Sequence, residues 1–325
     1  MRGRPAGTLA CLAVLAWASC ASAFGEDYPA RPIRIIVPTA AGGLADLSAR
    51  VFAQKLEERT KQAVIADNRP GAGGIIGAEF AAKSPPDGYT LMIGAQQWMA
   101  ILPSLKSDLP YDPVKDFVPV AQMVRAPLIL VVHPSLPAKT VADLVALAKA
   151  RPGKLSYGSA GRGSMGQLTA EEFKQLAGVD IVGVSYKGVA PATQDLMAGH
   201  LTLTFDLVPN VTQQVRAGLL RALAVTVPQR VTALPGVPTM AEAGLPDVQA
   251  INWFALFAPA KTPPAIVAWL NRQADEIFAA PDVRQRFEAE NVMLPGGPPE
   301  ALGAYMAEER ARWRRVIDKA GLKLE

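Results

Sequence analysis

The stretch IRIIVPTAAGGLADLSAR, residues 33–50, decides the fold. Its first five residues form an apolar, β-branched run that is typical of a buried strand, and Pro, Ala and Gly residues follow at once. Apolar residues then recur at helical spacing from Leu47 to Leu56, and Asp46 stands in the first turn of that helix. The stretch therefore predicts a strand, a tight glycine-rich turn and an amphipathic helix.

The same unit recurs along the chain. Such an alternation is typical of an α/β fold, in which mostly parallel sheets are flanked by helices. The further strands that we expect are AVIAD (63–67), YTLMIG (89–94), LILVV (128–132), LSYGS (155–159), GVSY (183–186), LTLTFD (201–206) and LLRALAVT (219–226).

Two proline-rich segments, 102–120 and 234–248, are expected to be long connections between the helices and strands. Between them lies a block with its own series of strands and helices. We therefore predict two lobes, the first formed by 24–124 together with 235–325, and the second by 125–234.

The first residues have the pattern of a secretory signal peptide. Arg2 and Arg4 precede an apolar stretch, and Ala21-Ser22-Ala23 is a cleavage signal, so we predict a signal peptide over 1–23 that is cleaved after Ala23. Ala18-Ser19-Cys20 resembles the end of a lipoprotein signal, but Trp17 stands where that motif has Leu, Val or Ile. The mature chain is therefore expected to be exported and soluble.

Composition excludes several classes of protein. Both cysteines, Cys11 and Cys20, fall in the predicted signal peptide, so neither a disulfide nor a thiolate-bound metal is expected in the mature chain. The net charge of +4 is scattered, which argues against a nucleic-acid partner. Half of the residues are apolar, enough for a large core, and no apolar run after the signal peptide is long enough to span a membrane.

Three turns between a strand and a helix are candidates for binding. They are PTAAGGLAD (38–46), GSAGRGSMGQ (158–167) and YKGVAPATQD (186–195). Each places small residues at the start of a helix, where free backbone N–H groups and the helix dipole favour an anion. Ligands of open α/β sheets lie beyond the carboxyl ends of the strands, so we expect the three turns to face a cleft between the lobes.

Cofactor binding and catalysis have weaker support. The pattern G-x-G-x-x-G occurs at 161–166, but the next strand is followed by Lys187 and not by the acidic residue that a nucleotide ribose requires, so no cofactor is expected. His133 and His200 are the only histidines, and no G-x-S-x-G motif is present. A hydrolase with Ser159 or Ser164 as its nucleophile remains an alternative.

Several of these motifs together resemble those of a known family. From about Tyr28 to the C-terminal helix it is similar to the Bug/TctC family of tripartite tricarboxylate transporter substrate-binding proteins. The motifs are VPTAAGGLADLSAR (37–50), NRPGAGGIIGAEFAAKSPPDGYTL (68–91), YGSAGRGSMG (157–166), VSYKGVAPATQDLMAGHLTLTFD (184–206) and LPGVPTMAEAGLP (234–246).

The resemblance implies a fold like that of periplasmic binding proteins, with a ligand cleft between the lobes. It further implies a monomeric periplasmic receptor that binds a small organic carboxylate, performs no chemistry, and delivers the carboxylate to the membrane subunits of a tripartite tricarboxylate transporter. An extracytoplasmic sensor for a signalling partner is an alternative. A transcription regulator would need an N-terminal helix-turn-helix, where the signal peptide stands.

The resemblance also implies the ligand-binding residues. Backbone N–H groups of the loops Thr39–Leu44 and Tyr186–Ala192 hold one carboxylate in the family, and other residues meet the far end of the ligand. The residues implied are Thr39, Ala41, Gly42, Gly43, Gln96, Ser159, Ser164, Lys187, Gly188, Ala190, Pro191, Ala192 and Asp206, with Asn252 and Trp253 as weaker candidates.

Several side chains have a more specific expectation. Pro191 suits the first position of a helix. Asp46 is expected to organise its loop rather than to bind, because it would repel an anion. Gln167 stands where many relatives have a histidine, and Trp98 is expected either to narrow the pocket or to belong to the core. The identity of the carboxylate stays open.

Overall fold

A computed structural model describes residues 28–322. The predicted signal peptide, its cleavage site after Ala23 and both cysteines lie outside the described residues. The helices and strands are β1 (Ile33–Val37), α1 (Leu44–Thr60), β2 (Val64–Asn68), the 3-10 helix η1 (Ala72–Gly74), α2 (Ile75–Ala82), β3 (Thr90–Ala95), the π-helix η2 (Gln97–Ile101), α3 (Leu102–Leu105), β4 (Phe117–Val132), α4 (Val141–Ala150), β5 (Ser156–Ser159), α5 (Met165–Ala177), β6 (Val182–Ser185), α6 (Val189–Met197), β7 (Leu203–Leu207), α7 (Val208–Arg216), β8 (Arg221–Val225), β9 (Ile251–Pro259), α8 (Pro264–Ala279), α9 (Pro281–Glu288) and α10 (Pro299–Ala320).

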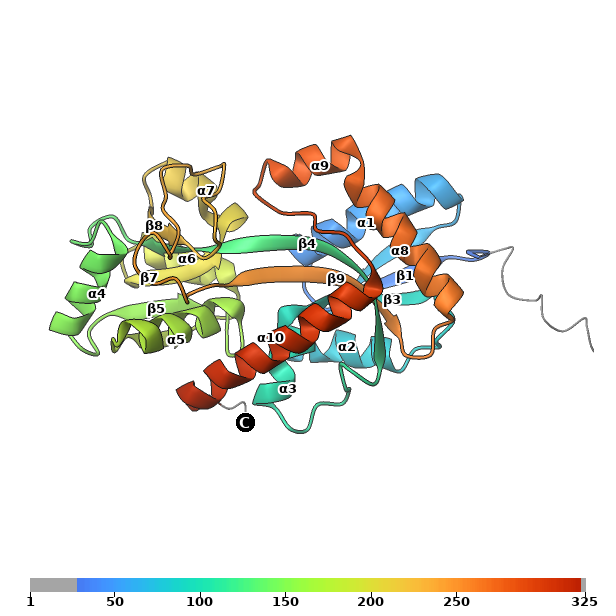
Figure 1. Ribbon diagram of the computed structural model, residues 1–325, viewed down its shortest axis with the longest axis horizontal. Coiled ribbons are helices and arrows are strands. Elements are labelled where there is room, and N and C mark those ends of the chain that lie inside the picture. Colours follow the sequence, from blue (N-terminus) through green and yellow to red (C-terminus); the bar gives the residue numbers. More distant parts are fainter. Residues whose placement is uncertain (1–27, 323–325) are drawn as a thin grey trace, which may run out of the picture.

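The strands form one continuous sheet in the order β2-β1-β3-β9-β4-β7-β5-β6, and β8 pairs with β4. At one end β1 is parallel to β2 and β3, and at the other end β5 is parallel to β6 and β7. The two long strands β4 and β9 are antiparallel to each other and to their other neighbours. They run through both lobes and join them, which gives the two-lobed α/β architecture that the sequence predicts (Figure 1).

The two long strands, which together we call the β4–β9 ribbon, both differ from the sequence expectation. β4 begins at Phe117, inside the segment 102–120 that was expected to be a connection, and β9 was not among the predicted strands. Pro119 in β4 is tolerated because it lies next to a register shift in the pairing with β9, and bulges are where a strand can lack an N–H donor.

The buried side chains form a separate core in each lobe. One cluster packs β1, β3, β9 and the first half of β4 against α1 and α8, while the other two pack the second half of β4 against the helices of the second lobe. Along β4 the side chains pass from the core of the first lobe to that of the second between Ala126 and Leu128. On the return of the chain toward β9, Val248 and Ala250 still pack in a core of the second lobe. We propose that the chain crosses between lobes at these two places, so the later boundary lies nearer 250 than 235.

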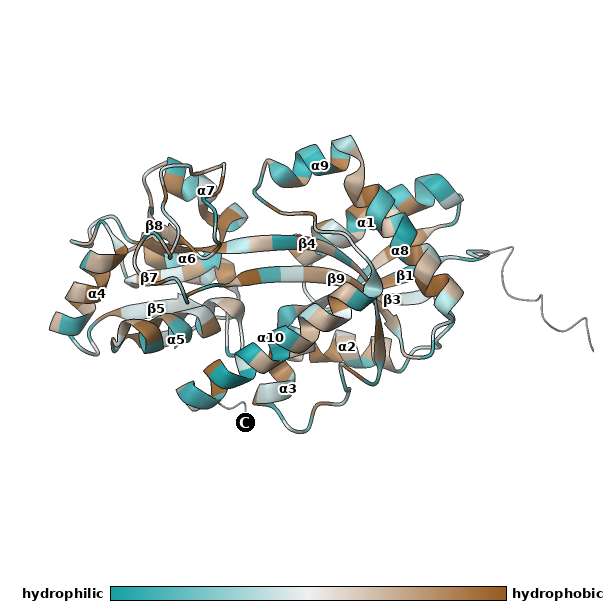
Figure 2. Cartoon of the chain, viewed as in Figure 1, coloured by the Kyte–Doolittle hydropathy of each residue, from teal (hydrophilic) through white to brown (hydrophobic). Residues whose placement is uncertain are grey.

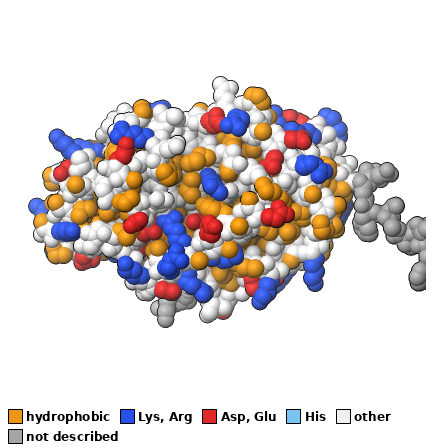
Figure 3. All heavy atoms as spheres, in the orientation of Figure 1, with side chains coloured by type: hydrophobic (Ala, Val, Ile, Leu, Met, Phe, Trp, Pro, Cys, Tyr) orange, Lys and Arg blue, Asp and Glu red, His pale blue; other side chains and the backbone are white. Residues whose placement is uncertain are grey.

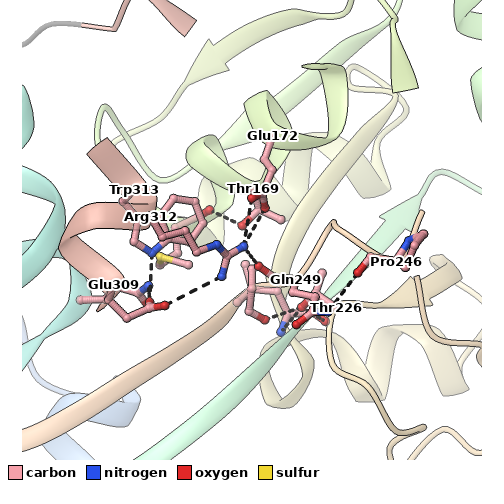
Figure 4. A network of polar contacts seen from close by, with 12 residues as sticks. Thr169, Glu172, Thr226, Pro246, Gln249, Glu309, Arg312 and Trp313 are labelled. Atoms are coloured by element: carbon pink, nitrogen blue, oxygen red, sulfur yellow. Dashed lines mark hydrogen bonds and ion pairs between the residues drawn. The ribbon is translucent and has the colours of Figure 1, made fainter. Parts of the chain in front are cut away.

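Helix α10 binds the two lobes together. Leu302 and Met306 pack in the first core, whereas Trp313 and Ile317 pack in a core of the second lobe. Arg312 reaches from α10 to Glu172 on α5, with a distance of 2.9 Å between Nη2 and Oε2, and Figure 4 shows this network. The position of α5, whose first residues face the cleft, therefore depends on α10.

The exposed faces of α1, α9 and α10 are largely polar. Figure 2 shows hydrophilic residues along α1, α9 and α10, and Figure 3 shows basic and acidic side chains interspersed over the same face of the molecule. Among the helices that the structure describes, none is both long and apolar enough to cross a membrane.

Candidate ligand-binding site

A cavity of about 640 Å³ lies between the lobes. Its wall comes from the turns after β1, β5 and β7, from the start of α6, and from the ribbon of β4 and β9. Pockets of this size hold small organic molecules. The cavity is therefore the candidate ligand site, and it lies where the three glycine-rich turns were expected to meet.

The N-termini of four helices contribute to the wall of this cavity. The residues at or next to these helix starts are Gly43 and Leu44 at α1, Ser164 and Met165 at α5, Val189 and Ala190 at α6, and Leu207 and Asn210 at α7. The first N–H groups of a helix have no partner within the helix, and the helix dipole makes them attractive to negative charge. Four such ends at one cavity favour an anion.

The turn before α1 is shaped by a buried carboxylate. Asp46 is only 4% exposed and accepts a hydrogen bond from the Gly42 N–H at 3.0 Å. The Asn68 amide donates both to the other oxygen of Asp46, at 2.9 Å, and to the Thr39 carbonyl at 3.1 Å. Asp46 does not line the cavity. It organises the loop, as the sequence reading expected.

The protonation of Asp46 follows from these contacts. Burial raises the pKa of this carboxyl, but the hydrogen bonds from Arg50, Gly42 and Asn68 outweigh it and hold the pKa below its usual value. Asp46 is therefore ionised at neutral pH. Because Gly42 already donates to Asp46, the N–H groups that this loop can offer to a ligand begin at Gly43, whose φ of −86° and open surroundings leave its main chain exposed to the cavity.

The turn before α5 is held by its own side chains. The Ser164 hydroxyl caps α5 by accepting the Gln167 N–H at 3.4 Å, and the Gln167 side chain accepts the Gly163 N–H at 2.7 Å. Gln167 thus fixes the loop. Gly166 brings α5 close to β7, because a Cβ atom there would lie 2.5 Å from the Phe205 carbonyl oxygen.

The turn before α6 differs from the expectation in one respect. α6 begins at Val189, so Pro191 is its third residue and not its first. A proline is still tolerated there, because the N–H groups of the first turn have no helical partner. Gly188 has a φ of +128°, a backbone conformation that favours glycine. The Lys187 side chain is exposed and does not line the cavity.

Asp206, at the end of β7, is a carboxyl in the cavity wall. It is 5% exposed, and one of its oxygens accepts from the Leu207 N–H at 2.7 Å and from the Asn210 amide at 2.8 Å. Thr193 donates to the other oxygen at 3.2 Å. Burial nevertheless raises the pKa of Asp206 above its usual value.

The cavity has no basic side chain to neutralise a bound anion. Among the residues of 28–322 that line it, none is a lysine, an arginine or a histidine, and Asp206 is the one acidic residue. A ligand carboxylate would therefore be bound by N–H groups and hydroxyls rather than by an ion pair.

Gln96 does not lie where the sequence placed it. Its side chain is fully buried and donates to the Glu309 carboxylate on α10, away from the cavity. The next two residues, Gln97 and Trp98, line the cavity instead, because the chain enters the π-helix η2 at this point. The Trp98 indole N–H donates to the Gly73 carbonyl at 2.7 Å, so Trp98 is both core and cavity wall.

The outcome for the other candidates can be stated together. The structure brings these to the cavity wall: Thr39, Gly42, Gly43, Ser159, Ser164, Ala190, Ala192, Asp206 and Asn252. Outside the wall lie Ala41, Gln96, Lys187, Gly188, Pro191 and Trp253. Trp253 is fully buried, because successive residues of β9 face opposite sides and its neighbour Asn252 faces the cavity.

Sequence reasoning missed the contribution of α7. Asn210 and Gln214 line the cavity together with Thr193, Gln194 and Thr204. The signal was present in LTLTFDLVPN (201–210), where a strand is followed by a proline that suits the first turn of a helix.

Neither histidine lies beside a candidate nucleophile. The His133 ring nitrogen Nδ1 is 2.7 Å from the Ser135 hydroxyl, and His200 lies against Asp195. Neither lines the cavity that holds Ser159 and Ser164. The hydrolase alternative therefore has no imidazole beside either serine among the described lining residues.

Comparison with known proteins identifies the family of this chain. The model of the tripartite tricarboxylate transporter family receptor matches residues 48–322. Protein BugT from Bordetella pertussis is 39% identical over 301 residues, which cover 92% of this chain and 92% of BugT.

Two solved structures are similar over nearly the whole chain. R. palustris Rpa4515 with adipate is 38% identical, with a TM-score of 0.85, and the match covers 91% of this chain and 99% of that one. MatC from Rhodopseudomonas palustris with bound malate is 32% identical, with a TM-score of 0.80 and coverages of 89% and 99%. This chain therefore belongs to the TctC family, the receptors of tripartite tricarboxylate transporters.

Proposed function

We propose that this protein is a periplasmic receptor that captures a small organic carboxylate between its lobes and delivers it to a tripartite tricarboxylate transporter permease. The observation that carries the proposal is the convergence of four helix N-termini on a cavity whose described lining contains no basic side chain. Backbone N–H groups that bond to an ionised oxygen form shorter and stronger hydrogen bonds than neutral pairs do.

The ligand carboxylate would lie between the turns before α1 and α6. Gly43 on the first lobe and Ala190 and Ala192 on the second are the lining residues of these turns at which a main chain can approach closely, because none carries a side chain beyond Cβ. Thr39 adds a hydroxyl that is buried without a partner within 28–322. A buried donor without an acceptor is costly, so a ligand oxygen would stabilise this site.

The rest of the ligand would extend toward Ser159, Ser164 and Asp206. These side chains are joined by Gln97, Trp98 and Asn252, so polar groups and an aromatic surface share the wall. Adipate and malate in the two solved relatives are both dicarboxylates, which makes carboxylic acids of this size the first compounds to examine. The predicted signal peptide supports export to the periplasm.

A thermal-shift screen tests the proposal. The mature chain, 24–325, is heated with mono-, di- and tricarboxylates, amino acids and neutral isosteres. A ligand present at about 100 times its Kd adds about 2.7 kcal/mol to the free energy of unfolding, which shifts the midpoint measurably. Stabilisation by a carboxylate supports the proposal, and stabilisation by neutral compounds alone contradicts it.

Delivery to a permease needs a separate experiment. Cells without this protein should lose high-affinity uptake of the carboxylate found in the screen, and the gene for the intact chain should restore it. Unchanged uptake in cells without the protein would contradict a role in transport while leaving ligand binding intact.

A further inference from the structure

A second groove, which we call the rear groove, lies on the opposite face of the β4–β9 ribbon from the ligand cavity. Its volume is about 880 Å³, and its walls come from β4, the segments around β8 and β9, the segment after α9, and α10. Successive residues of a strand point to opposite faces, and this alternation separates the two sites. Asn252 and Leu128 line the ligand cavity, whereas their neighbours Ile251 and Pro127 line the rear groove.

The arginines of the rear groove are not equivalent. Of those that the structure describes there, three have a carboxylate partner, with nitrogen–oxygen distances of 2.9 Å for Arg230 with Glu242, 2.7 Å for Arg284 with Glu288 and 2.9 Å for Arg312 with Glu172. Arg125 has no carboxylate oxygen within 4.0 Å among residues 28–322. Among the arginines that the structure describes in the rear groove, Arg125 is therefore the one without a carboxylate within 4.0 Å.

The guanidinium of Arg125 is held in place by neutral groups. It stacks over the Tyr305 ring, 4.2 Å from the centroid, and its Nη2 donates to the side-chain oxygen Oε1 of Gln122 at 2.6 Å. Its Nε is buried and has no acceptor in the described chain. A stacked and oriented guanidinium loses little freedom when a planar anion binds to it.

Three further buried donors also lack acceptors among the described residues. Gln122 Nε2, Trp253 Nε1 and Asn291 Nδ2 are all buried without a partner among the described residues. Trp253 is the direct neighbour of Arg125 across the β4–β9 pairing, and Asn291 lines the same groove. Buried donors are nearly always paired, because an unpaired one costs about 1–3 kcal/mol.

We infer that the rear groove binds a carboxylate group against Arg125, either from a free small anion or from an acidic side chain of a protein partner. A carboxylate offers two coplanar oxygens, which match the planar guanidinium. Glu309, which lines the same groove, opposes anions in proportion to their charge, so a singly charged carboxylate is favoured over ions of higher charge. Because the walls of the rear groove come from both lobes, a bound carboxylate would influence how the two lobes are positioned relative to each other.

The indole N–H groups give a site-specific experiment. The tryptophans of the mature chain are Trp98, Trp253, Trp269 and Trp313. In 15N NMR spectra of the mature protein, Trp98 reports on the ligand cavity and Trp269 on a remote part of the first lobe. Trp253 reports on the rear groove indirectly, because it is fully buried and its ring centroid lies 6.2 Å from that of Tyr305, which lines the groove. Acetate should shift the Trp253 signal in a saturable manner while the Trp269 signal stays in place.

Two variants connect the shift to Arg125. Arg125→Gln should abolish the Trp253 response to acetate, whereas Arg284→Gln, at an arginine that already has a partner, should keep it. Gln122→Glu places a carboxylate beside Arg125 within the chain, so it should raise the Tm without acetate and remove the response to acetate. It also provides a test if Arg125→Gln does not fold.

A short glutamate-rich peptide distinguishes the two sources of the carboxylate. A Trp253 shift at much lower concentrations of peptide than of acetate indicates a protein partner, and equal concentrations per carboxylate indicate a free anion. The inference is overturned if neither compound shifts the Trp253 signal before that of Trp269 moves, or if the shift persists in Gln122→Glu. Binding in the ligand cavity is read independently at Trp98.

Discussion

The carboxylate of Asp46 accepts the backbone N–H of Gly42 at 3.0 Å, so a buried acid shapes the loop on which we place an anion site. Asp46→Asn should therefore weaken ligand binding without removing a ligand contact. The new amide would direct N–H groups at the donors of Gly42, Asn68 or Arg50, and a buried mismatch of this kind costs about 1–3 kcal/mol of stability. Urea unfolding and calorimetric titration measure both effects.

The pH dependence of this variant follows from the lowered pKa of Asp46. A lowered pKa in the folded state adds stability above the ordinary value of 3.8, and this stability is lost as the pH falls through the folded value. Asp46→Asn should lack that component. Asp143→Asn is the control, since Asp143 belongs to the capping box of α4 and should change stability but not affinity. Equal losses of affinity in both variants would contradict a specific role for Asp46.

Gly43→Val should abolish binding and leave the fold intact. No atom lies within 4 Å of a Cβ built on Gly43, and its φ of −86° suits any residue, so the valine is accommodated by projecting beside the main chain at the cavity. A carboxylate could then no longer approach the N–H groups of this turn. Gly236→Val, at another unobstructed glycine outside the cavity wall, is the matched control. Undiminished affinity in Gly43→Val would contradict the binding of the carboxylate by backbone N–H groups of this turn.

Ser164→Ala should weaken binding by about 1–2 kcal/mol if the hydroxyl donates to a charged ligand group. The same change removes the N-cap of α5, which by itself costs about 1 kcal/mol of stability. Thr140→Ala removes the cap of α4, away from the cavity, and separates the two effects. The dissociation constant should rise for Ser164→Ala and stay constant for Thr140→Ala; a constant value for both would remove Ser164 from the site.

The stability of Asp206→Asn relative to the wild type should increase as the pH rises. Burial raises the pKa of Asp206, so the folded state holds this proton more tightly than the unfolded state does. The wild type therefore loses stability as the pH rises from about 3.8, until the folded carboxyl has itself ionised. Stability curves of both proteins across this range measure the difference. A stability difference that does not grow with pH would contradict a raised pKa.

The first strand, turn and helix could be predicted from sequence because each depends on neighbouring residues. The apolar run that ends at Val37, the glycines at 42 and 43, and Asp46 in the first turn determine local conformation on their own. The same holds for the turn before α5. Gly161 and Gly163 have positive φ, which glycine favours, and Ser164 caps the helix, a position that serine favours.

The parts that could not be predicted depend on distant contacts. The side chain of Gln96 points to Glu309, more than two hundred residues later, and nothing near Gln96 distinguishes it from Gln97. β9 is a nearly continuous apolar run that is buried on both faces, and without alternation such a run does not separate strand from helix. Its pairing with β4 then positions both the cavity and the rear groove.

The central claim is that N–H groups of the main chain bind a carboxylate in the cavity between the lobes. Calorimetric titration of the best carboxylate from the screen, and of its primary amide, tests this claim most directly. The account predicts that the acid binds at least about tenfold more tightly than the amide, a difference of about 1.4 kcal/mol or more. Equal affinities would contradict it, because the helix N-termini would then not be responding to charge.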